Sequence, residues 1–424
     1  MKKIMFFAIA AAGLFASCTS DDNFDANASL LQESAANGRM PIEIGLGKIA
    51  AINTRGTGTV GDTVGGTNNV WQNQNVNIFM FKKDSLDLAL IDEVKDRTPI
   101  YDQTVFRTDT TGLDKNRAID MTDAIKYYPT SGAFDFWGYR LDGAGTSIPA
   151  QTATNSYDSP SKQVKFGIEI DGSQDIMWAK AVPSHTDTLA LIDENEVNHS
   201  DRAYSAYAAR RGVQPELNFK HLLTRLHFQI LAGTFDASAL SANGIFVDSI
   251  GIETRTKGTF TVAYTPAHKP DSLIAWETER DTLYLQRRPK PGDAGYDDDV
   301  PAENQNLVAL TPVAPEGTGT SESDFQAVPT EVGEALLVAH DTQYRLIVKL
   351  HQNVISKEDG VTTEEKPFTV PATLKVDGGF KPGYNYNVLI TLYGLSNIEI
   401  TATLAKWENG GTLPITPEDT MFDE

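Results

Sequence analysis

Through most of the chain, apolar side chains recur at every second position rather than at the spacing of a helix. In the segment 41–47, Ile42, Ile44 and Leu46 alternate with polar or small residues, which places the three apolar side chains on one face of a strand. Similar runs are present at 76–81, 133–139, 164–170, 217–230, 245–252, 258–264, 334–339, 344–350, 386–392 and 398–405. Many short strands separated by turn residues are typical of antiparallel β-sandwiches.

Three stretches depart from this pattern. Residues 53–69 are rich in Gly and Thr, and residues 286–328 are rich in Pro and Gly and carry an acidic run, so both are predicted to be exposed loops. In 193–211 the aromatic residues lie at helical spacing, which predicts a short helix or helical linker. We therefore predict an all-β fold with little helix, made of two antiparallel β-sandwich domains in tandem over residues 39–214 and 215–424.

The N-terminus has the pattern of a cleavable export signal. Lys2 and Lys3 precede an apolar run at 4–15, and Ala16-Ser17 comes directly before Cys18, the only cysteine of the chain. Small residues before a single cysteine form a lipobox, at which a peptidase cuts and the thiol carries the lipid. We predict a signal peptide over 1–17 and a Cys18 that bears acyl chains such as palmitate. The alternative is an ordinary secretory signal with an incidental cysteine.

The polar residues after Cys18 indicate where the chain is sent. Residues 18–38 are small and polar, which is typical of a flexible tether between lipid and folded body. The acidic cluster at 19–23 resembles the surface-export signal of Bacteroidetes lipoproteins. These features predict a lipoprotein at the cell surface, on the outer face of the outer membrane, and the lipid is its only predicted contact with that membrane.

Charge and cysteine content exclude several classes of protein. The chain has 36 basic and 57 acidic residues, a net charge of -21 and a pI near 4.7, so it repels nucleic-acid phosphates and anionic lipid headgroups. No nucleic-acid partner is therefore expected. A single cysteine rules out a disulfide framework and a cysteine-rich metal site.

The sequence contains none of the common catalytic or cofactor motifs, such as a nucleophile elbow, a phosphate-binding loop or a zinc-protease helix. His221 and His227 are six residues apart, which on one strand is about 20 Å and too far for a shared metal. The run Asp297-Asp298-Asp299 lacks the spacing of a calcium loop. We predict no catalytic, cofactor or metal site and no enzyme. A hydrolase is a third hypothesis, for which no catalytic pair can be nominated.

Aromatic residues gather in the first predicted domain, where they could form a platform for sugars or pack in the core. Alternation along 134–139 favours core packing, because one set of side chains faces inward and neighbours cover much of the other. The residues concerned are Tyr127, Tyr128, Phe134, Phe136, Trp137, Tyr139 and Trp178.

Several short segments occur in a characteristic order after the signal. They are Thr54-Arg55-Gly56, Asn69-Val70-Trp71 before the 76–81 strand, Tyr127-Tyr128-Pro129 before 134–139, Asp175 to Ala179, Phe219 to Leu226, Gly379 to Tyr386 and Ile398 to Trp407. This order resembles the fimbrillin family of Bacteroidales, the lipoprotein precursors of type V pilus subunits. The resemblance covers nearly the whole chain. It departs from the family where no Gly-Asp follows Trp71 and where the tail extends beyond Trp407.

The resemblance implies two transthyretin-like sandwiches and a subunit that joins a homo- or hetero-polymer for cell adhesion. It also implies that an arginine-specific protease removes the N-terminal strand. Arg55 lies in the loop just after that strand and is the predicted cleavage site. Arg39 is the rival site, where cleavage would release the lipid but keep the strand. The alternative is that Arg55 is a surface arginine and not a cleavage site.

A vacated groove would be filled by β-augmentation from another subunit. The predicted donor is either the strand 398–405 or the tail 412–416, in which Pro414 removes one ladder hydrogen bond. The alternative function is a surface glycan-binding lipoprotein of a polysaccharide-uptake system. An exposed aromatic platform would favour glycan binding, whereas a removable first strand followed by an arginine in a loop favours polymerisation.

Overall fold

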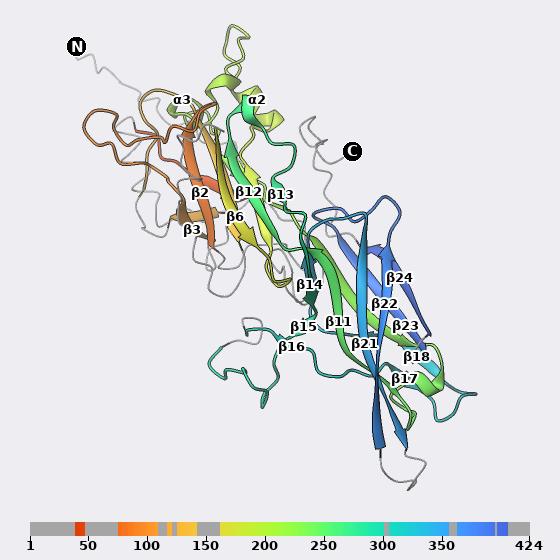
Figure 1. Ribbon diagram of the computed structural model, residues 1–424. Coiled ribbons are helices and arrows are strands. Elements are labelled where there is room, and N and C mark those ends of the chain that lie inside the picture. Colours follow the sequence, from red (N-terminus) through yellow and green to blue (C-terminus); the bar gives the residue numbers. More distant parts are fainter. Residues whose placement is uncertain are drawn as a thin grey trace, which may run out of the picture.

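The computed structural model describes residues 39–46, 75–108, 117–120, 125–141, 162–300, 305–355, 363–394 and 397–405. Figure 1 shows these residues as an elongated molecule with two β-rich lobes. The N-lobe contains β1 to β9 with β12 and β13, and the C-lobe contains the remaining long strands. The all-β fold with little helix predicted from the sequence is confirmed. Within the described ranges, no helix is both long enough and apolar enough to cross a membrane.

The largest sheet of the N-lobe has the strand order β8-β1-β4-β3-β2-β5-β7-β9. Its strands are β1 (Ile44–Leu46), β2 (Asn75–Lys82), β3 (Thr104–Thr108), β4 (Arg117–Asp120), β5 (Phe134–Leu141), β7 (Ile176–Lys180), β8 (Glu216–Leu217) and β9 (Lys220–His221). The two end strands, β8 and β9, are separated by only two residues of chain. Three peptide units span at most about 11 Å, so the sheet curls until its two ends approach each other.

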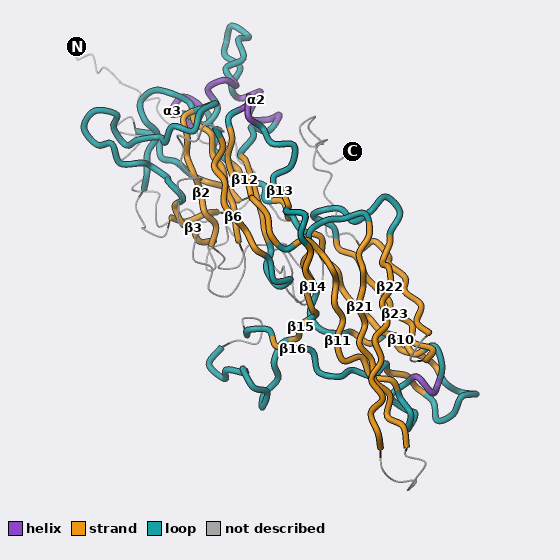
Figure 2. The backbone as a smooth tube through the Cα atoms, in the orientation of Figure 1, coloured by secondary structure: helices purple, strands orange, loops and turns teal. Residues whose placement is uncertain are grey.

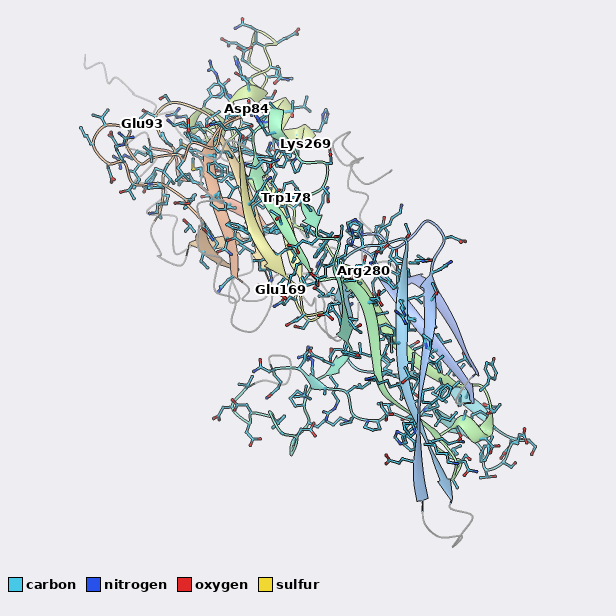
Figure 3. The ribbon with its side chains drawn as sticks, viewed as in Figure 1. Asp84, Glu93, Glu169, Trp178, Lys269 and Arg280 are labelled. Atoms are coloured by element: carbon cyan, nitrogen blue, oxygen red, sulfur yellow. The ribbon has the colours of Figure 1, made fainter. Side chains whose placement is uncertain are left out.

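A smaller sheet covers one face of β5. It has the order β13-β12-β6 and consists of β6 (Gln163–Glu169), β12 (Lys257–Tyr264) and β13 (Ile274–Trp276). The indole of Trp178 on β7 donates a 2.7 Å hydrogen bond to the carbonyl oxygen of Val262, which ties the two sheets together. In Figure 3 Trp178 lies in the middle of the N-lobe.

Three short helical turns lie between β7 and β8, and buried alanines of the third share a core cluster with Phe136 on the other face of β5. They are α2 (His185–Ala190), η2 (Ser200–Arg202) and α3 (Ala206–Ala209). Figure 2 draws helices in purple. The helix predicted over 193–211 is therefore interrupted. Tyr204 has a φ of 55°, which ends helical geometry, and the side chain of Ser205 caps the new start at α3.

The C-lobe has two main sheets. One has the order β19-β10-β23-β24 with β20 also paired to β10, and the other has the order β14-β11-β21-β22. Their strands are β10 (Thr224–Ala232), β11 (Ile245–Arg255), β14 (Arg280–Tyr284), β19 (Thr330–Glu331), β20 (Leu336–Val338), β21 (Gln343–Ile355), β22 (Thr363–Lys375), β23 (Asn385–Gly394) and β24 (Asn397–Ala405). Leu226, Phe228 and Ile230 on β10 are fully buried between these sheets.

The predicted strand 217–230 is broken where the lobes meet. β8 and β9 belong to the N-lobe sheet, whereas β10 belongs to the C-lobe. Leu222 and Leu223 lie between β9 and β10. The Leu222 amide donates to the carbonyl of Ile176 in the N-lobe, and the Leu223 carbonyl accepts from the amide of Gly383 in the C-lobe. Both leucines are buried. The chain therefore passes from one lobe to the other between these two residues.

The chain crosses between the lobes again at Thr256. This residue separates β11, in the C-lobe, from β12, in the N-lobe. Residues 257–276 therefore pair with the N-lobe although they follow the predicted boundary at 214. Strand pairing crosses that boundary, and the division into 39–214 and 215–424 stays a proposal.

The stretch 286–328, predicted as an exposed excursion, contains two short antiparallel strand pairs. β15 (Gln286–Arg287) pairs with β16 (Val308–Ala309), and β17 (Glu316–Thr318) pairs with β18 (Gln326–Val328). Two 3-10 turns complete the described elements, η3 (Phe235–Ala237) and η4 (Pro266–His268). In Figure 1 the segment that joins β15 to β16 extends sideways from the C-lobe, and β15 is tied to that lobe by a 2.7 Å hydrogen bond from the Glu334 amide to the Gln286 carbonyl oxygen.

Candidate strand-exchange site

The first described segment fills an interior groove of the N-lobe. Ile42, Ile44 and Leu46 are only 8%, 3% and 1% exposed, whereas Glu43 between them is half-buried. The three side chains belong to one core cluster with Ile78 on β2 and other buried residues of the N-lobe. The alternation read from the sequence therefore corresponds to a strand with one fully buried face.

β1 is flanked by strands on both sides. It pairs antiparallel with β4, with Ile44 opposite Ala118, and parallel with β8, with Leu46 opposite Leu217. An interior strand satisfies its own backbone groups and those of two neighbours. Loss of β1 would leave unpaired donors and acceptors along both β4 and β8, at the bottom of an apolar groove.

The residues just before β1 are also paired. The Ile42 amide donates to the carbonyl of Lys126 at 2.9 Å, and the carbonyl of Met40 accepts from the Tyr128 amide at 2.9 Å. Pro41 forms an isolated bridge with Tyr127. The paired segment therefore runs from Met40 to Leu46, longer than β1 itself.

Gln214 connects the incoming segment to the rest of the lobe. Its Nε2 donates to the carbonyl oxygen of Pro41 at 3.0 Å, and its Oε1 accepts from the Glu43 amide at 3.4 Å and from the Tyr128 hydroxyl at 3.2 Å. Burial raises the pKa of Tyr128 well above its usual value, so its hydroxyl keeps the proton that it donates. We call these three bonds the Gln214 bridge. The sequence analysis missed it, because a lone Gln carries no pattern.

Arg39 is the first residue of this described segment. Its side chain is exposed, and its guanidinium carbon is 5.9 Å from the ring centroid of Tyr127. The peptide bond after Arg39 borders the paired residues, so cleavage there leaves all of β1 in place. The other two predicted sites, Cys18 and Arg55, lie outside the described residues.

The two predicted donor segments differ in what the structure describes. β24 pairs antiparallel with β23 from Asn385 opposite Ala405 to Leu392 opposite Ile398. In the described sheet it is an edge strand, with β23 as its one neighbour. The tail 412–416 lies outside the described residues.

The aromatic residues singled out in the sequence are mostly core residues. Five of them are at most 5% exposed and the other two are half-buried. Rings from β5 pack on both sides: Phe136 meets Tyr204 edge-on at 5.9 Å, and Trp137 meets Tyr264 at 4.8 Å. This segment therefore presents no exposed aromatic platform, and the prediction of core packing is confirmed.

The two histidines considered for metal binding have separate partners. Nδ1 of His221 lies 2.5 Å from the buried carboxylate of Asp175, and Nε2 of His227 lies 3.8 Å from Glu331. The break at Leu222-Leu223 places them in different sheets, so the prediction that both lie on one strand was wrong. Among the described residues, no three His, Cys, Asp or Glu side chains are grouped to hold a metal ion.

The described chain is thus a two-lobed all-β protein whose first strand occupies an interior position in a sheet. A family model for fimbrillin-like proteins matches residues 63–407. The chain belongs to the fimbrillin-like family. No curated protein sequence matches it.

The solved structures that match this chain include three proteins from Bacteroides and Porphyromonas. A candidate cell adhesion protein from Bacteroides uniformis is 14% identical, with a TM-score of 0.41 and coverage of 88% of this chain and 98% of that one. A fimbrial protein from Bacteroides vulgatus is 12% identical, with a TM-score of 0.41 and coverages of 87% and 99%. The fimbrial anchor protein Mfa2 from Porphyromonas gingivalis is 8% identical, with a TM-score of 0.30 and coverages of 86% and 98%.

Proposed function

We propose that this chain is a structural subunit of a bacterial surface pilus or fimbria that serves cell adhesion. It is exported as a lipoprotein through Cys18 and polymerises by donor-strand exchange with other subunits. Membership of the fimbrillin-like family supports the pilus role and a structural rather than an enzymatic one. The observation that carries the assembly mechanism is the interior position of β1 between β4 and β8.

Cleavage after Arg55 would separate β1 from the rest of the chain. Because β1 then has no covalent link to the lobe, only its side-chain burial and backbone pairing retain it. Each of Ile42, Ile44 and Leu46 contributes about 1.5–3 kcal/mol by burial, and the empty groove loses this stabilisation. An incoming strand with alternating apolar residues restores both the burial and the hydrogen bonds.

We take the tail 412–416, rather than β24, as the donor strand. Withdrawing β24 would break its whole ladder with β23 and open the C-lobe core beside it. In the tail, Leu413 and Ile415 are spaced to fill two inward positions of the groove. Pro414 falls between them and removes one donor, which an interior strand tolerates poorly.

The test is digestion of the purified precursor with an arginine-specific protease, followed by N-terminal sequencing. A new N-terminus at Gly56 together with heat-stable polymers supports the proposal. The matched variants are Arg55→Lys, which should stay monomeric, and Arg39→Lys, which should polymerise as the wild type does. A terminus at Met40, or at Gly56 with persistent monomers, would overturn it.

The membrane part of the proposal has its own test. Cys18→Ala should leave an unprocessed precursor or a released chain, because no thiol then receives the lipid. Fractionation of cells with antiserum to this chain reports its location. If the variant still fractionates with the outer membrane at normal mobility, the lipid assignment is wrong.

A further inference from the structure

An exposed tyrosine lies across the outer face of the C-lobe sheet β14-β11-β21-β22. Tyr284 on β14 is opposite Gly251 on β11 and is 43% exposed. A Cβ added at Gly251 would lie 3.0 Å from Cε1 and 3.1 Å from Cδ1 of Tyr284. The ring therefore rests on the glycine, and Nζ of Lys349 lies 5.4 Å from its centroid.

A polar cavity of about 490 Å³ opens further along the same face, and Tyr284 is not one of its lining residues. Its charged lining groups are Glu253, Arg280, Asp341 and Arg345. Arg345 Nη1 donates to Glu253 at 3.3 Å, and Arg280 Nη2 donates to Asp341 at 2.5 Å. Figure 3 places Arg280 close to where the two lobes meet.

The tyrosine and the cavity are within reach of one extended ligand. Glu253 is two residues beyond Gly251 on the same strand and the same face, a separation of about 7 Å. Thr282 lies opposite Glu253, between Arg280 and Tyr284 on the neighbouring strand. The face therefore presents an aromatic ring and, one step further along the strands, a group of paired charges.

The chemistry of these groups selects the ligand. Each carboxylate accepts hydrogen bonds and each guanidinium donates several, so a neighbouring pair can satisfy both functions of a hydroxyl group. The charged groups that line the cavity balance, two arginines against two carboxylates, so the lining itself gives no preference for an anion. An exposed ring beside polar groups that fix orientation suits a ligand with an apolar face and many hydroxyls. We propose that this face binds a neutral oligosaccharide, with one sugar stacked on Tyr284 and the next in the cavity.

A tyrosine over a glycine also stabilises a sheet without any ligand. The chain offers a matched case in Tyr393, which is 42% exposed and contacts the position of a Cβ at Gly233. Tyr393 lies on β23, in the other main sheet of the C-lobe. It therefore serves as a control for an exposed tyrosine beside a glycine on a different sheet from the cavity.

The experiment is saturation-transfer NMR on the full, uncleaved chain with a panel of neutral trisaccharides: maltotriose, cellotriose, mannotriose, xylotriose and chitotriose. At least one should bind the wild type with a Kd at or below about 1 mM. Tyr284→Ala and Arg345→Gln should each weaken it at least about tenfold, and Tyr393→Ala should leave it unchanged. Both substituted residues are exposed, so circular dichroism should show wild-type folding.

Three results would overturn the proposal. They are no binding of any neutral trisaccharide by the wild type, binding that survives both Tyr284→Ala and Arg345→Gln, and equal loss in Tyr393→Ala. Gly251→Ala provides a further test, because its new methyl group would displace the Tyr284 ring and should reduce binding while leaving the cavity charges in place. Polymer formation is not needed for any of these measurements, so they stand apart from the pilus proposal.

Discussion

Phe228 is a single side chain on which much of the C-lobe packing depends. It is fully buried on β10 within the core cluster that also contains Leu226 and Val388. We predict that Phe228→Ala lowers the free energy of unfolding by about 3–5 kcal/mol, since it removes buried surface and leaves a cavity. Guanidinium denaturation measures this. Phe368→Ala is the control, because Phe368 is 41% exposed and should change stability by less than about 0.5 kcal/mol.

Gln214 is predicted to control how firmly the first strand is held. Gln214→Leu would leave the Pro41 carbonyl and the Tyr128 hydroxyl without a partner, at a cost of about 1–3 kcal/mol. Hydrogen exchange at the Ile42 and Gly45 amides should accelerate, while exchange in the C-lobe stays constant. Tyr128→Phe, which removes one of the three bonds, should have a smaller effect. Unchanged exchange in Gln214→Leu would show that the bridge does not hold the strand.

His227 is predicted to make the protein less stable in mild acid. Burial lowers the pKa of its imidazole, and nearby Arg225 lowers it further, although Glu331 acts in the opposite sense. In the unfolded chain the pKa is about 6.5, so the unfolded state binds more protons in the window between the two values. The free energy of unfolding should therefore fall as the pH drops below about 6.5.

The matched variant for this pH effect is His227→Gln, in which the position no longer titrates. Denaturation at several pH values between neutral and mildly acidic conditions should show a smaller loss of stability than in the wild type. A variant with the same pH dependence as the wild type would contradict the assignment to His227.

Individual residues were predictable where a pattern constrains them. The burial of Ile42, Ile44 and Leu46 follows from alternation alone. The break between His221 and His227 does not, because Leu222 and Leu223 look like ordinary members of a strand. Their burial depends on contacts between the two lobes that form only on folding. No local sequence pattern indicates those contacts.

At the scale of elements, strands with clear alternation were predicted well, and β22 was missed. Its sequence contains Glu364, Glu365, Lys366 and two prolines, Pro367 and Pro371, all of which argue against a strand. The structure places β22 at the edge of its sheet, where a proline needs no ladder partner on its outer side. Whether a strand is at an edge depends on long-range pairing, which local sequence does not show.

The identity of the donor is a prediction about elements. A chain that ends at residue 410 keeps β24 but lacks the tail 412–416, so its precursor should fold normally and fail to polymerise after cleavage. Pro414→Val should strengthen assembly, because it restores a ladder donor. Unboiled gel electrophoresis after protease treatment measures polymer length. Polymers from the truncated chain would identify β24 as the donor instead.

At the scale of the whole molecule, the two lobes should unfold together. One hydrophobic cluster includes Phe79 and Trp137 from the N-lobe and Leu226 and Leu346 from the C-lobe. Shared core residues couple the stability of the lobes. Calorimetry should therefore show one main transition. This coupling was not predictable from the sequence, since residues 257–276 return to the N-lobe from a position well inside the second half.

The contact between the lobes can be weakened at Gly172. Its φ is 94°, its carbonyl accepts from the Leu337 amide at 2.8 Å, and an added Cβ would lie 2.6 Å from Cδ1 of Leu336. Gly172→Ala should split or broaden the thermal transition. Gly212→Ala is the control, because its φ of 77° imposes similar backbone strain while an added Cβ meets nothing within 4 Å. Equal effects of the two variants would contradict a role for the contact between lobes.

The passage of β11 into β12 has a mechanical consequence. From Ile245 to Tyr264 the chain is extended apart from the step at Thr256, a length of about 65 Å, and it runs through both lobes. Antiparallel neighbours flank it in each lobe: β14 and β21 in one, β13 and β6 in the other. Their hydrogen bonds lie across the direction of pull, so tension along the molecule loads them in parallel, in shear, rather than one after another. Under flow, such a subunit resists stretching as a stiff rod.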